Sequence, residues 1–217
     1  MKKWTYILFD LDGTLTDPYE GITKCVQYAL EAFGFPGEPQ EKLKKFIGPP
    51  LKESFMDFYG FDDASANAAV EKYRERFTDI GIFENTLYDG IAQMLAALKA
   101  DGRKLGVASS KPEVFVERIL EHFHIRQYFD YVAGSFLDGR RTDKSEVIEA
   151  ALLGLKVSDR DDVVMVGDRW HDVAGALKSG LACIGVAFGY GGREELTNAG
   201  ALAVADSVGE LTDFLLS

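Results

Sequence analysis

The chain has 217 residues, of which 47% are hydrophobic and 27% are charged, a composition typical of a globular protein and not of a disordered one. Its formal net charge of -11 excludes a nucleic acid or an anionic membrane as the main partner, because both require a basic surface. No stretch approaches the ~20 apolar residues of a membrane helix, and the first apolar run breaks at Asp10, which excludes a secretory signal. We therefore expect a cytoplasmic protein with no nucleic-acid or membrane partner.

Four short apolar runs predict strands, because continuous runs are typical of strands that are buried on both faces of a parallel sheet. Between them, apolar residues recur at helical spacing, as in residues 91–98 and 147–152. Alternation of buried strands with helices is the pattern of an open α/β fold. The sequence therefore predicts a Rossmann-like parallel sheet with helices on both faces. The four predicted strands are residues 6–9, 104–109, 162–166 and 182–186.

The segment between the first two predicted strands interrupts this alternation. It contains helical patterns, such as the apolar positions Ile22, Val26 and Leu30, and no convincing buried strand. Two clusters of glycine and proline, at residues 34–39 and 48–50, divide it into shorter helices. A helical insertion after the first strand is the simplest account. The predicted domains are a helical cap at residues 17–83 and an α/β core at residues 1–16 and 84–217.

Carboxylate and hydroxyl side chains lie where the predicted strands end. Asp10 and Asp12 follow the first strand. Ser109 and Ser110 end the second strand, and Asp168 follows the third. Because ligands bind beyond the carboxyl ends of the strands in an open parallel sheet, we expect these side chains to line one crevice.

Two further residues, Lys144 and Asp172, can face the same crevice. Asp172 lies four residues after Asp168, so the two carboxylates share a face if a helix begins there. Lys144 lies at the entry to the predicted helix EVIEAALLGL, and it has the best spacing before a helix. Arg140 and Arg141 are close to it in the sequence, which leaves open whether one of them completes the site instead.

Four carboxylates in one crevice repel one another, and without compensation some of them stay protonated near neutral pH. A bound divalent cation removes this conflict. Oxygen ligands without a set of cysteine or histidine residues favour Mg²⁺, which usually takes one or two protein carboxylates together with a substrate phosphate. The sequence therefore predicts Mg²⁺ as the cofactor and a small phosphorylated metabolite as the partner.

The same residues, in the same order, resemble the four motifs of the haloacid dehalogenase superfamily. The resemblance is carried by DLDGT at residues 10–14, Ser109, Lys144 and GDRWHD at residues 167–172. A helical cap between the first and second motifs is also typical of that family. The segments DLDGTLTDPYEGITKCVQYAL, IGPPL and FGYGGREEL are similar to its phosphoglycolate phosphatase and 5′-nucleotidase-like branch. The resemblance implies a hydrolase that acts on phosphoric monoesters.

The resemblance also implies a role for each charged residue. Asp10 is expected to be the nucleophile that forms an aspartyl-phosphate. Asp12 is expected to protonate the leaving alcohol and then to accept a proton from the attacking water. The carboxylates of Asp10 and Asp168, with the backbone carbonyl of Asp12, are expected to bind Mg²⁺. Lys144 is expected to offset negative charge, and Asp172 to hold metal-bound water or to orient that lysine.

Besides Lys144, hydrogen-bond donors for the phosphate are expected from two places. Ser109 and Ser110 supply hydroxyl groups, and the loop that contains Gly13 and Thr14 supplies backbone N–H groups. Plain structural roles stay open as well. The two serines can cap a helix that begins directly after them, and Asp168 can be the cap of the helix that follows it.

Substrate choice depends on the cap, where the sequence leaves alternatives open. The turn at residues 48–51 can close over the crevice or simply join two helices. Lys52, Arg74 and Arg76 can bind a second anionic group of the substrate or be solvated surface residues. We expect a monomer or a homodimer.

Two alternative functions share parts of this pattern. A phosphomutase of the β-phosphoglucomutase type shares the aspartyl-phosphate step, but Thr14 favours hydrolysis because relatives of that type commonly have another residue there. A non-catalytic, receiver-like module also clusters aspartates around Mg²⁺, but such modules are shorter and lack a large helical insertion. The glycine-rich GYGG at residues 189–192 lacks the spacing of a dinucleotide-binding or P-loop motif.

Overall fold

The computed structural model describes residues 4–217, which divide into two compact units. The first unit comprises the chain up to Asp17 together with Leu87–Ser217, and the second comprises Pro18–Thr86. Two short strands, β2 (Thr16–Asp17) and β3 (Thr86–Leu87), pair with each other where the chain passes between the units. Within the described part of the chain, no helix combines the length and the apolar character needed to cross a membrane.

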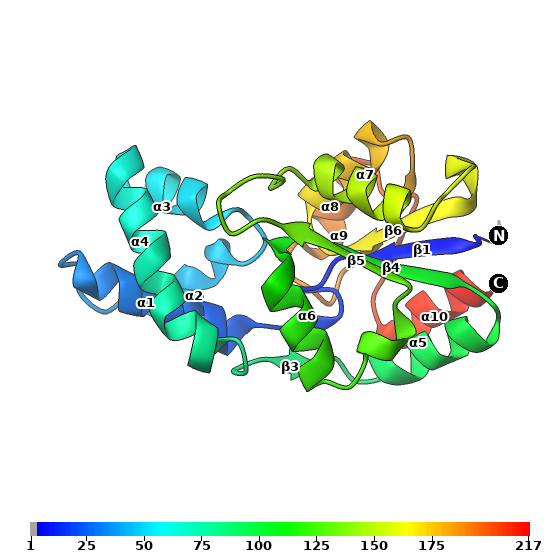
Figure 1. Cartoon of the computed structure of the whole chain (residues 1–217), viewed down its shortest axis with the longest axis horizontal. Coiled ribbons are helices and arrows are strands. Elements are labelled where there is room, and N and C mark those ends of the chain that lie inside the picture. The colour runs from blue at the N-terminus through cyan, green and yellow to red at the C-terminus, as the bar shows by residue number, and fades with distance from the viewer. Residues whose placement is uncertain (1–3) are drawn as a thin grey trace. The chain divides into compact units, whose positions relative to one another are not determined.

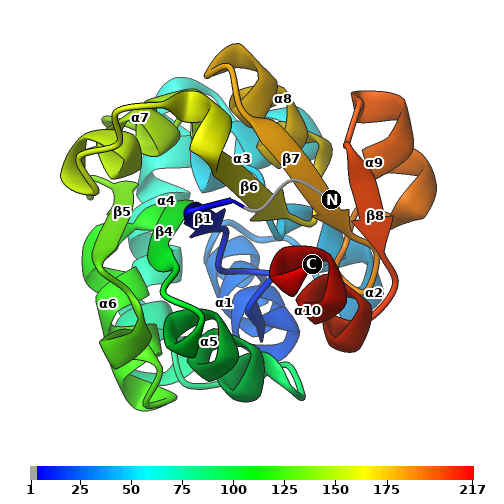
Figure 2. The same ribbon diagram turned by 90° about the vertical axis from the view of Figure 1, so that its right-hand side faces the viewer.

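A six-stranded sheet forms the centre of the first unit (Figures 1 and 2), with strand order β5-β4-β1-β6-β7-β8. Every pair of neighbouring strands in it is parallel, so the predicted Rossmann-like α/β fold is confirmed. The central strand, YILF, has three fully buried apolar residues in a row, as expected for a strand covered on both faces. The strands are β1 (Tyr6–Phe9), β4 (Lys104–Pro112), β5 (Tyr131–Ser135), β6 (Val163–Gly167), β7 (Ala182–Val186) and β8 (Ala203–Ala205).

Helices cover both faces of this sheet. One face carries α7, α8 and α9, and the other carries α5, α6 and α10 (Figure 2). On the first of these faces, Leu8 of β1 joins Val147 of α7 and Val173 of α8 in one buried apolar cluster. The helices are α5 (Ile91–Ala100), α6 (Glu113–His122), α7 (Lys144–Gly154), α8 (Trp170–Lys178), α9 (Gly192–Ala199) and α10 (Val208–Leu216), with short 3₁₀ turns at Arg126–Tyr128 and Arg160–Asp162.

The second unit is entirely helical apart from Thr86 in β3. Its core is aromatic: the ring centroids of Phe46 and Phe55 lie 5.1 Å apart, and the ring of Phe55 stacks on that of Phe61 at 5.7 Å. Its elements are α1 (Tyr19–Ala32), α2 (Gln40–Leu43), a 3₁₀ turn (Lys44–Phe46), α3 (Leu51–Tyr59), α4 (Asp63–Arg76) and a π-helical turn (Phe77–Gly81).

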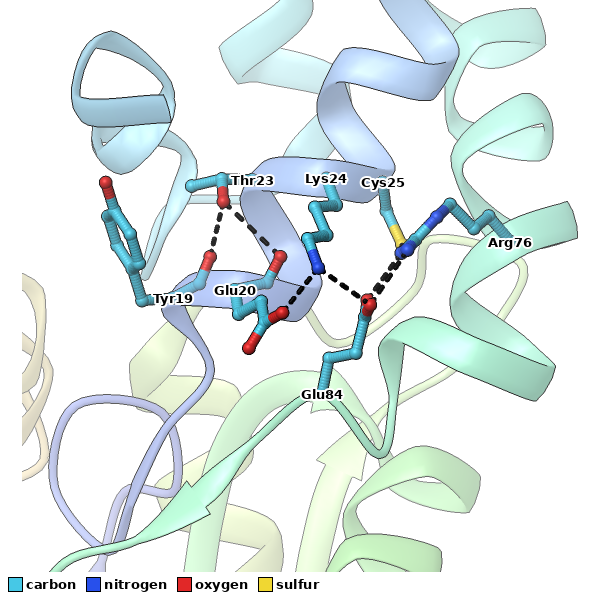
Figure 3. Close-up of polar contacts among 7 residues, drawn as sticks. All are labelled: Tyr19, Glu20, Thr23, Lys24, Cys25, Arg76 and Glu84. Carbon is cyan, nitrogen blue, oxygen red and sulfur yellow. Dashed lines mark hydrogen bonds and ion pairs between the residues drawn. The ribbon is translucent and has the colours of Figure 1, made fainter. Parts of the chain in front are cut away.

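A group of polar contacts joins α1 and α4 to the end of the second unit (Figure 3). The carboxylate of Glu84 accepts two hydrogen bonds from the guanidinium of Arg76, at 2.6 and 3.0 Å, and one from Lys24 at 3.2 Å. Lys24 also pairs with Glu20, one turn earlier on α1. Arg76 donates a further hydrogen bond to the Sγ of the buried Cys25, at 3.2 Å. We refer to Glu20, Lys24, Arg76 and Glu84 as the Glu84 cluster.

Strand register fixes which residues meet at the carboxyl edge of the sheet. Phe9, the last residue of β1, pairs with Val107 of β4 on one side and with Val166 of β6 on the other. The ladder continues one step further, because the N–H of Asp10 donates to the carbonyl of Val166 at 2.9 Å. Residues that directly follow these pairs on the three strands therefore lie at one edge, which we call the acidic edge.

Candidate active site

The loop after β1 is a tight turn that carries the first two carboxylates. The carbonyl of Leu11 accepts backbone hydrogen bonds from Thr14, Leu15 and Thr16 at 2.9–3.3 Å, which closes the turn. Gly13 has a φ of 82°, and a Cβ at this position would overlap the carboxylate of Asp168. Glycine is therefore required both for the left-handed backbone and for the close approach of the loop to Asp168.

Lys144 connects two of the carboxylates from the first turn of α7. Its Nζ lies 2.8 Å from Oδ1 of Asp10 and 2.7 Å from Oδ1 of Asp172, and it donates to the carbonyl of Ala108 at 3.1 Å. The helix begins there because Asp143 is its N-cap, accepting a hydrogen bond from the N–H of Ser145. Burial alone would lower the pKa of Lys144, but the two carboxylates outweigh burial and raise it, so the ammonium stays charged.

The neighbouring arginines do not take the place of this lysine. Arg141 pairs with Glu113 at 2.8 Å, and Arg140 pairs with Asp138 at 2.8 Å. Of the three cations close together in the sequence, Lys144 is the one that contacts Asp10 and Asp172.

Asp168 and Asp172 are almost fully buried beside Asp10. One carboxylate oxygen from each of the three residues lies within 4.8 Å of the other two. Burial is the main reason that the pKa of Asp168 lies well above its ordinary value, and the charges of Asp172 and Asp10 add to the effect. Burial likewise raises the pKa of Asp172, although Lys144 opposes it.

Each of these two carboxylates is oriented by a backbone N–H group. Oδ2 of Asp172 accepts from the N–H of Arg169 at 3.0 Å, and Oδ2 of Asp168 accepts from the N–H of Tyr190 at 2.8 Å. Among residues 4–217, no hydrogen-bond donor reaches Oδ1 of Asp168, although this atom is buried. A buried carboxylate oxygen without a donor is costly unless a cation meets it.

Asp12 pairs with a lysine that the sequence analysis did not assign to the site. Nζ of Lys111 lies 2.5 Å from Oδ2 of Asp12, and both side chains are about one tenth exposed. Burial raises the pKa of Asp12, while the charge and the hydrogen bond of Lys111 oppose that rise. In the sequence, Lys111 stands next to a proline after two serines and looks like a surface residue at a helix start. No sequence pattern distinguishes this buried lysine from lysines that lie on the surface.

The predicted phosphate ligands fall into two groups. Ser109 is buried and Ser110 half-buried towards the end of β4, at the acidic edge of the sheet. The N–H groups of Gly13 and Thr14 are already used inside the loop, because they donate to the carbonyls of Thr16 and Leu11 at 2.7 and 3.3 Å. A contact of these two N–H groups with phosphate would require those bonds to open. Their observed role is to shape the loop.

The plain helix-capping alternatives do not fit the structure. Strand β4 runs through both serines, and α6 begins only at Glu113, with Pro112 as its N-cap. Helix α8 begins at Trp170 with Arg169 as its N-cap, so Asp168 lies one residue too early to be the cap. The serines and Asp168 are therefore held at the acidic edge without serving as helix caps.

Within residues 4–217, the ion pairs of the acidic edge leave a surplus of negative charge. Four buried carboxylates face two lysine ammonium groups. His171 adds no positive charge at pH 7, because burial and the nearby Arg169 lower its pKa to about 4. An edge with surplus negative charge, hard oxygen ligands and an unpartnered carboxylate oxygen fits a divalent cation. The charged residues that meet at the acidic edge are Asp10, Asp12, Lys111, Lys144, Asp168 and Asp172.

The cationic candidates of the second unit are all paired with carboxylates. Lys52 lies 2.6 Å from Asp63, and Arg74 lies 2.6 Å from Glu71. Arg76 belongs to the Glu84 cluster. Binding of a second anionic group by any of these residues would have to replace an ion pair.

Comparison with known proteins adds independent findings. The family model described as haloacid dehalogenase-like hydrolase matches residues 7–186. The chain is 49% identical over 194 residues to a 5′-nucleotidase of Pseudomonas aeruginosa, an alignment that covers 89% of this chain and 87% of that protein. It is 38% identical over 211 residues to the tyrosine-protein kinase PtkA of Mycobacterium tuberculosis, covering 96% of this chain and 72% of that protein. Phosphoglycolate phosphatases also match.

A solved structure matches nearly the whole chain. The crystal structure of a predicted phosphatase from Clostridium acetobutylicum has 50% sequence identity to this chain and a TM-score of 0.96, and the match covers 99% of each chain. The similarity therefore extends over both units and is not limited to the sheet.

Proposed function

Because the chain belongs to the haloacid dehalogenase-like hydrolase family, as its motifs predicted, we propose that it is a Mg²⁺-dependent phosphatase that works through an aspartyl-phosphate on Asp10. Its family and its relatives indicate a phosphoric monoester hydrolase that acts on small phosphorylated substrates. The observation that carries the proposed Mg²⁺ dependence and aspartyl-phosphate mechanism is the surplus of buried carboxylates at the acidic edge. Its cytoplasmic location and its state as a monomer or homodimer stay predictions.

Exposure supports different tasks for the four carboxylates. Asp10 and Asp12 keep 6% and 9% of their surface accessible, whereas Asp168 and Asp172 keep only 1% and 2%. A nucleophile and a proton donor must reach the substrate, so the two accessible residues suit these roles. The two enclosed residues suit cation binding and the orientation of Lys144.

Asp10 is the proposed nucleophile. Lys144 holds its Oδ1 at 2.8 Å, which fixes the carboxylate in place for attack. In-line attack on phosphorus forms the aspartyl-phosphate and releases the alcohol, which divides one difficult displacement into two easier ones. Ser109, Ser110 and Lys144 are the proposed donors to the phosphoryl oxygens.

Asp12 is the proposed proton-transfer group. Its pKa is raised by burial, so the side chain can carry a proton to the leaving alcohol and later take one from the water that cleaves the intermediate. Lys111 lies beside it and opposes that rise. The lysine therefore limits how much of Asp12 is protonated before the substrate arrives.

The acidic edge also fits the predicted cation. The carboxylates of Asp10 and Asp168, with the backbone carbonyl of Asp12, would hold Mg²⁺, and Asp172 would support the site while pairing with Lys144. When bound, the cation supplies neutralisation of the charge on the carboxylates and on the transferring phosphoryl group. Oδ1 of Asp168 is a buried carboxylate oxygen of this site that no hydrogen-bond donor among residues 4–217 reaches.

Hydrolysis of p-nitrophenyl phosphate by the purified chain tests the proposal. We expect release of p-nitrophenol that requires Mg²⁺, stops with EDTA and falls at least about 10⁴-fold in Asp10→Asn. The matched control is Asp161→Asn, since Asp161 is an exposed aspartate. Acid quenching during turnover should trap a phosphorylated protein in the wild type and not in Asp10→Asn. Full activity of Asp10→Asn, or activity that survives EDTA, would contradict the mechanism.

The substrate is proposed from the relatives. Nucleoside monophosphates and phosphoglycolate are the first two candidates, and a panel of phosphate monoesters ranked by kcat/KM decides between them. The tyrosine-protein kinase relative makes phosphoryl transfer to tyrosine a second candidate. A tyrosine-containing peptide with ATP tests it, and accumulation of phosphotyrosine instead of free phosphate would favour transfer. The same panel, with a sugar phosphate added, detects the phosphomutase alternative.

A further inference from the structure

The segment after β7 packs directly against Asp168. The N–H of Tyr190 donates to Oδ2 of Asp168 at 2.8 Å, and the N–H of Gly191 donates to the carbonyl of the same residue at 3.1 Å. A Cβ on Gly189 would overlap the side chain of Asp168, so this position admits only glycine at the observed spacing. The glycines of GYGG thus allow a backbone to approach a carboxylate, which is a different use from a phosphate-binding loop.

The other end of Tyr190 is fixed as well. Its hydroxyl donates a hydrogen bond to Oδ1 of Asp17, where the N-terminal segment of the first unit ends. The preceding residue, Phe188, packs edge-to-face on Tyr88 with ring centroids 5.1 Å apart. The backbone at Phe188 and Tyr190 therefore has an apolar anchor, the ring of Tyr88, and a polar anchor, the hydrogen bond to Asp17.

The two oxygens of Asp168 have different environments. Oδ2 receives the N–H of Tyr190, whereas Oδ1 is buried with no donor from the described part of the chain. If the loop shifted, Oδ2 would lose its donor and the carboxylate could rotate. The orientation of Asp168 thus depends on where the backbone of Tyr190 lies, and that depends in part on Asp17.

We propose that Tyr190 is a positioning residue for Asp168, and that the hydrogen bond from its hydroxyl to Asp17 keeps Oδ1 of Asp168 directed at the cation. This inference rests on the proposed function, because it assumes that Asp168 binds Mg²⁺. We call the hydrogen bond between Tyr190 and Asp17 the Tyr190–Asp17 tether. Neither residue touches the phosphoryl group in this proposal, so their effect reaches the reaction only through Asp168.

The proposal predicts a loss of cation affinity, which a purely structural contact would not produce. Partners that orient a metal-binding side chain typically change metal affinity by about 10–100-fold when they are removed. Tyr190→Phe removes only the hydroxyl and keeps the N–H that bonds to Asp168. We therefore expect the dissociation constant for Mg²⁺ to rise about tenfold, at the lower end of that range.

The test is calorimetric titration of Mg²⁺ into the substrate-free chain, for the wild type and four variants. Tyr190→Phe and Asp17→Ala each break the tether, and the double variant should bind Mg²⁺ no more weakly than either single variant, because both remove the same bond. Asp17→Asn keeps an acceptor oxygen and should retain affinity near that of the wild type. Thermal unfolding in EDTA shows whether each variant folds.

The matched control is Tyr6→Phe. Tyr6 is a half-buried tyrosine at the start of β1, at the end of the strand opposite to Asp10, so its variant should bind Mg²⁺ like the wild type. Activity gives a second readout: kcat at saturating Mg²⁺ should stay near the wild-type value in Tyr190→Phe, while the Mg²⁺ concentration for half-maximal activity rises about tenfold.

The outcomes separate this inference from the proposed function. If the wild type binds Mg²⁺, and the folded Tyr190→Phe and Asp17→Ala variants bind it equally well, the positioning role alone is overturned. Absence of Mg²⁺ binding by the wild type would overturn both. Additive losses in the double variant would show that Tyr190 and Asp17 act separately, which also contradicts the tether.

Discussion

The acidic edge and the Glu84 cluster use the same kinds of side chain with opposite results. In the Glu84 cluster, two carboxylates meet two cations, and the side chains of Arg76 and Glu84 are about one fifth exposed. At the acidic edge, four carboxylates meet two lysines, and the four carboxylates are nine-tenths buried or more. In the Glu84 cluster, the positive and negative charges balance each other. At the acidic edge they do not, and the surplus charge is largely shielded from the solvent that could screen it.

This difference separates a stabilising ion-pair group from a reactive one. A balanced, partly exposed cluster gains a modest free energy of folding and needs nothing else. A buried surplus of like charge costs folding free energy unless a cation completes it. The raised pKa values of Asp12, Asp168 and Asp172 express that cost, whereas the pKa of Glu84 is lowered, chiefly by its hydrogen bonds from Arg76.

A large effect on both activity and stability is expected from a substitution that increases the surplus of negative charge. Lys144→Met removes a cation that contacts both Asp10 and Asp172, so we expect a loss of about 10³-fold in kcat/KM for p-nitrophenyl phosphate. The free energy of unfolding should also fall by roughly 3 kcal/mol, because a buried pair has lost one partner. Steady-state kinetics and urea denaturation measure the two effects.

Lys178→Met is the matched control for this change. Lys178 lies in the last turn of α8 with 66% of its side chain exposed, and its distance to Asp143 is 3.4 Å. Its substitution should leave kcat/KM unchanged. Equal kcat/KM values for Lys144→Met and Lys178→Met would mean that the acidic edge does not need Lys144 for activity.

A smaller effect on activity is expected where the proposed proton donor is replaced. Asp12→Asn should lower kcat/KM by about 10²-fold or more for an alkyl phosphate, because a poor leaving group needs protonation. The loss for p-nitrophenyl phosphate should be smaller, since p-nitrophenolate leaves without a proton. Comparing the two substrates in one variant therefore isolates the proton-transfer role. Equal losses for both esters would contradict it.

The smallest effect belongs to the balanced cluster. Glu84→Gln should lower the free energy of unfolding by about 1 kcal/mol, because its pairs are partly exposed. The lowered pKa of Glu84 makes this contribution fully present above the ordinary value of 4.5 and lost as the pH falls through the folded-state pKa. Urea denaturation at pH 7 and at pH 3 measures both statements.

The variant Glu71→Gln provides the comparison for Glu84. Glu71 pairs with Arg74 at 2.6 Å, but 70% of its side chain is exposed, so its loss should change stability less. If Glu84→Gln destabilised the protein equally at both pH values, the ionised carboxylate would not be the source of the effect.

Strands made of several large apolar residues in a row were predictable, whereas short strands made of small residues were not. The central strands were readable because Val, Ile, Leu and Met side chains fill both faces of the sheet. The edge strand β5 has the sequence YVAGS, and β8 is only AVA. Such small residues form strands here because a neighbouring strand offers hydrogen bonds, which is a tertiary cause that no local pattern reports.

The acidic edge was predictable for residues that follow predicted strands. Asp10, Asp12 and Asp168 could be expected together because parallel strands end at one edge of the sheet. Lys111 and Tyr190 could not, since the burial of one and the hydrogen bonds of the other arise only from packing. The sequence pattern predicts where each strand ends. It does not predict which side chains from other elements pack against the strand ends.

Thermal unfolding of the wild type and Asp168→Asn, each in EDTA and in excess Mg²⁺, tests most directly whether surplus buried charge is held for a cation. We expect Mg²⁺ to raise the midpoint of wild-type unfolding by roughly 5 °C or more. Asp168→Asn should unfold at a higher temperature than the wild type in EDTA and should lose most of the response to Mg²⁺. A wild type that ignores Mg²⁺, together with a variant that is less stable in EDTA, would contradict it.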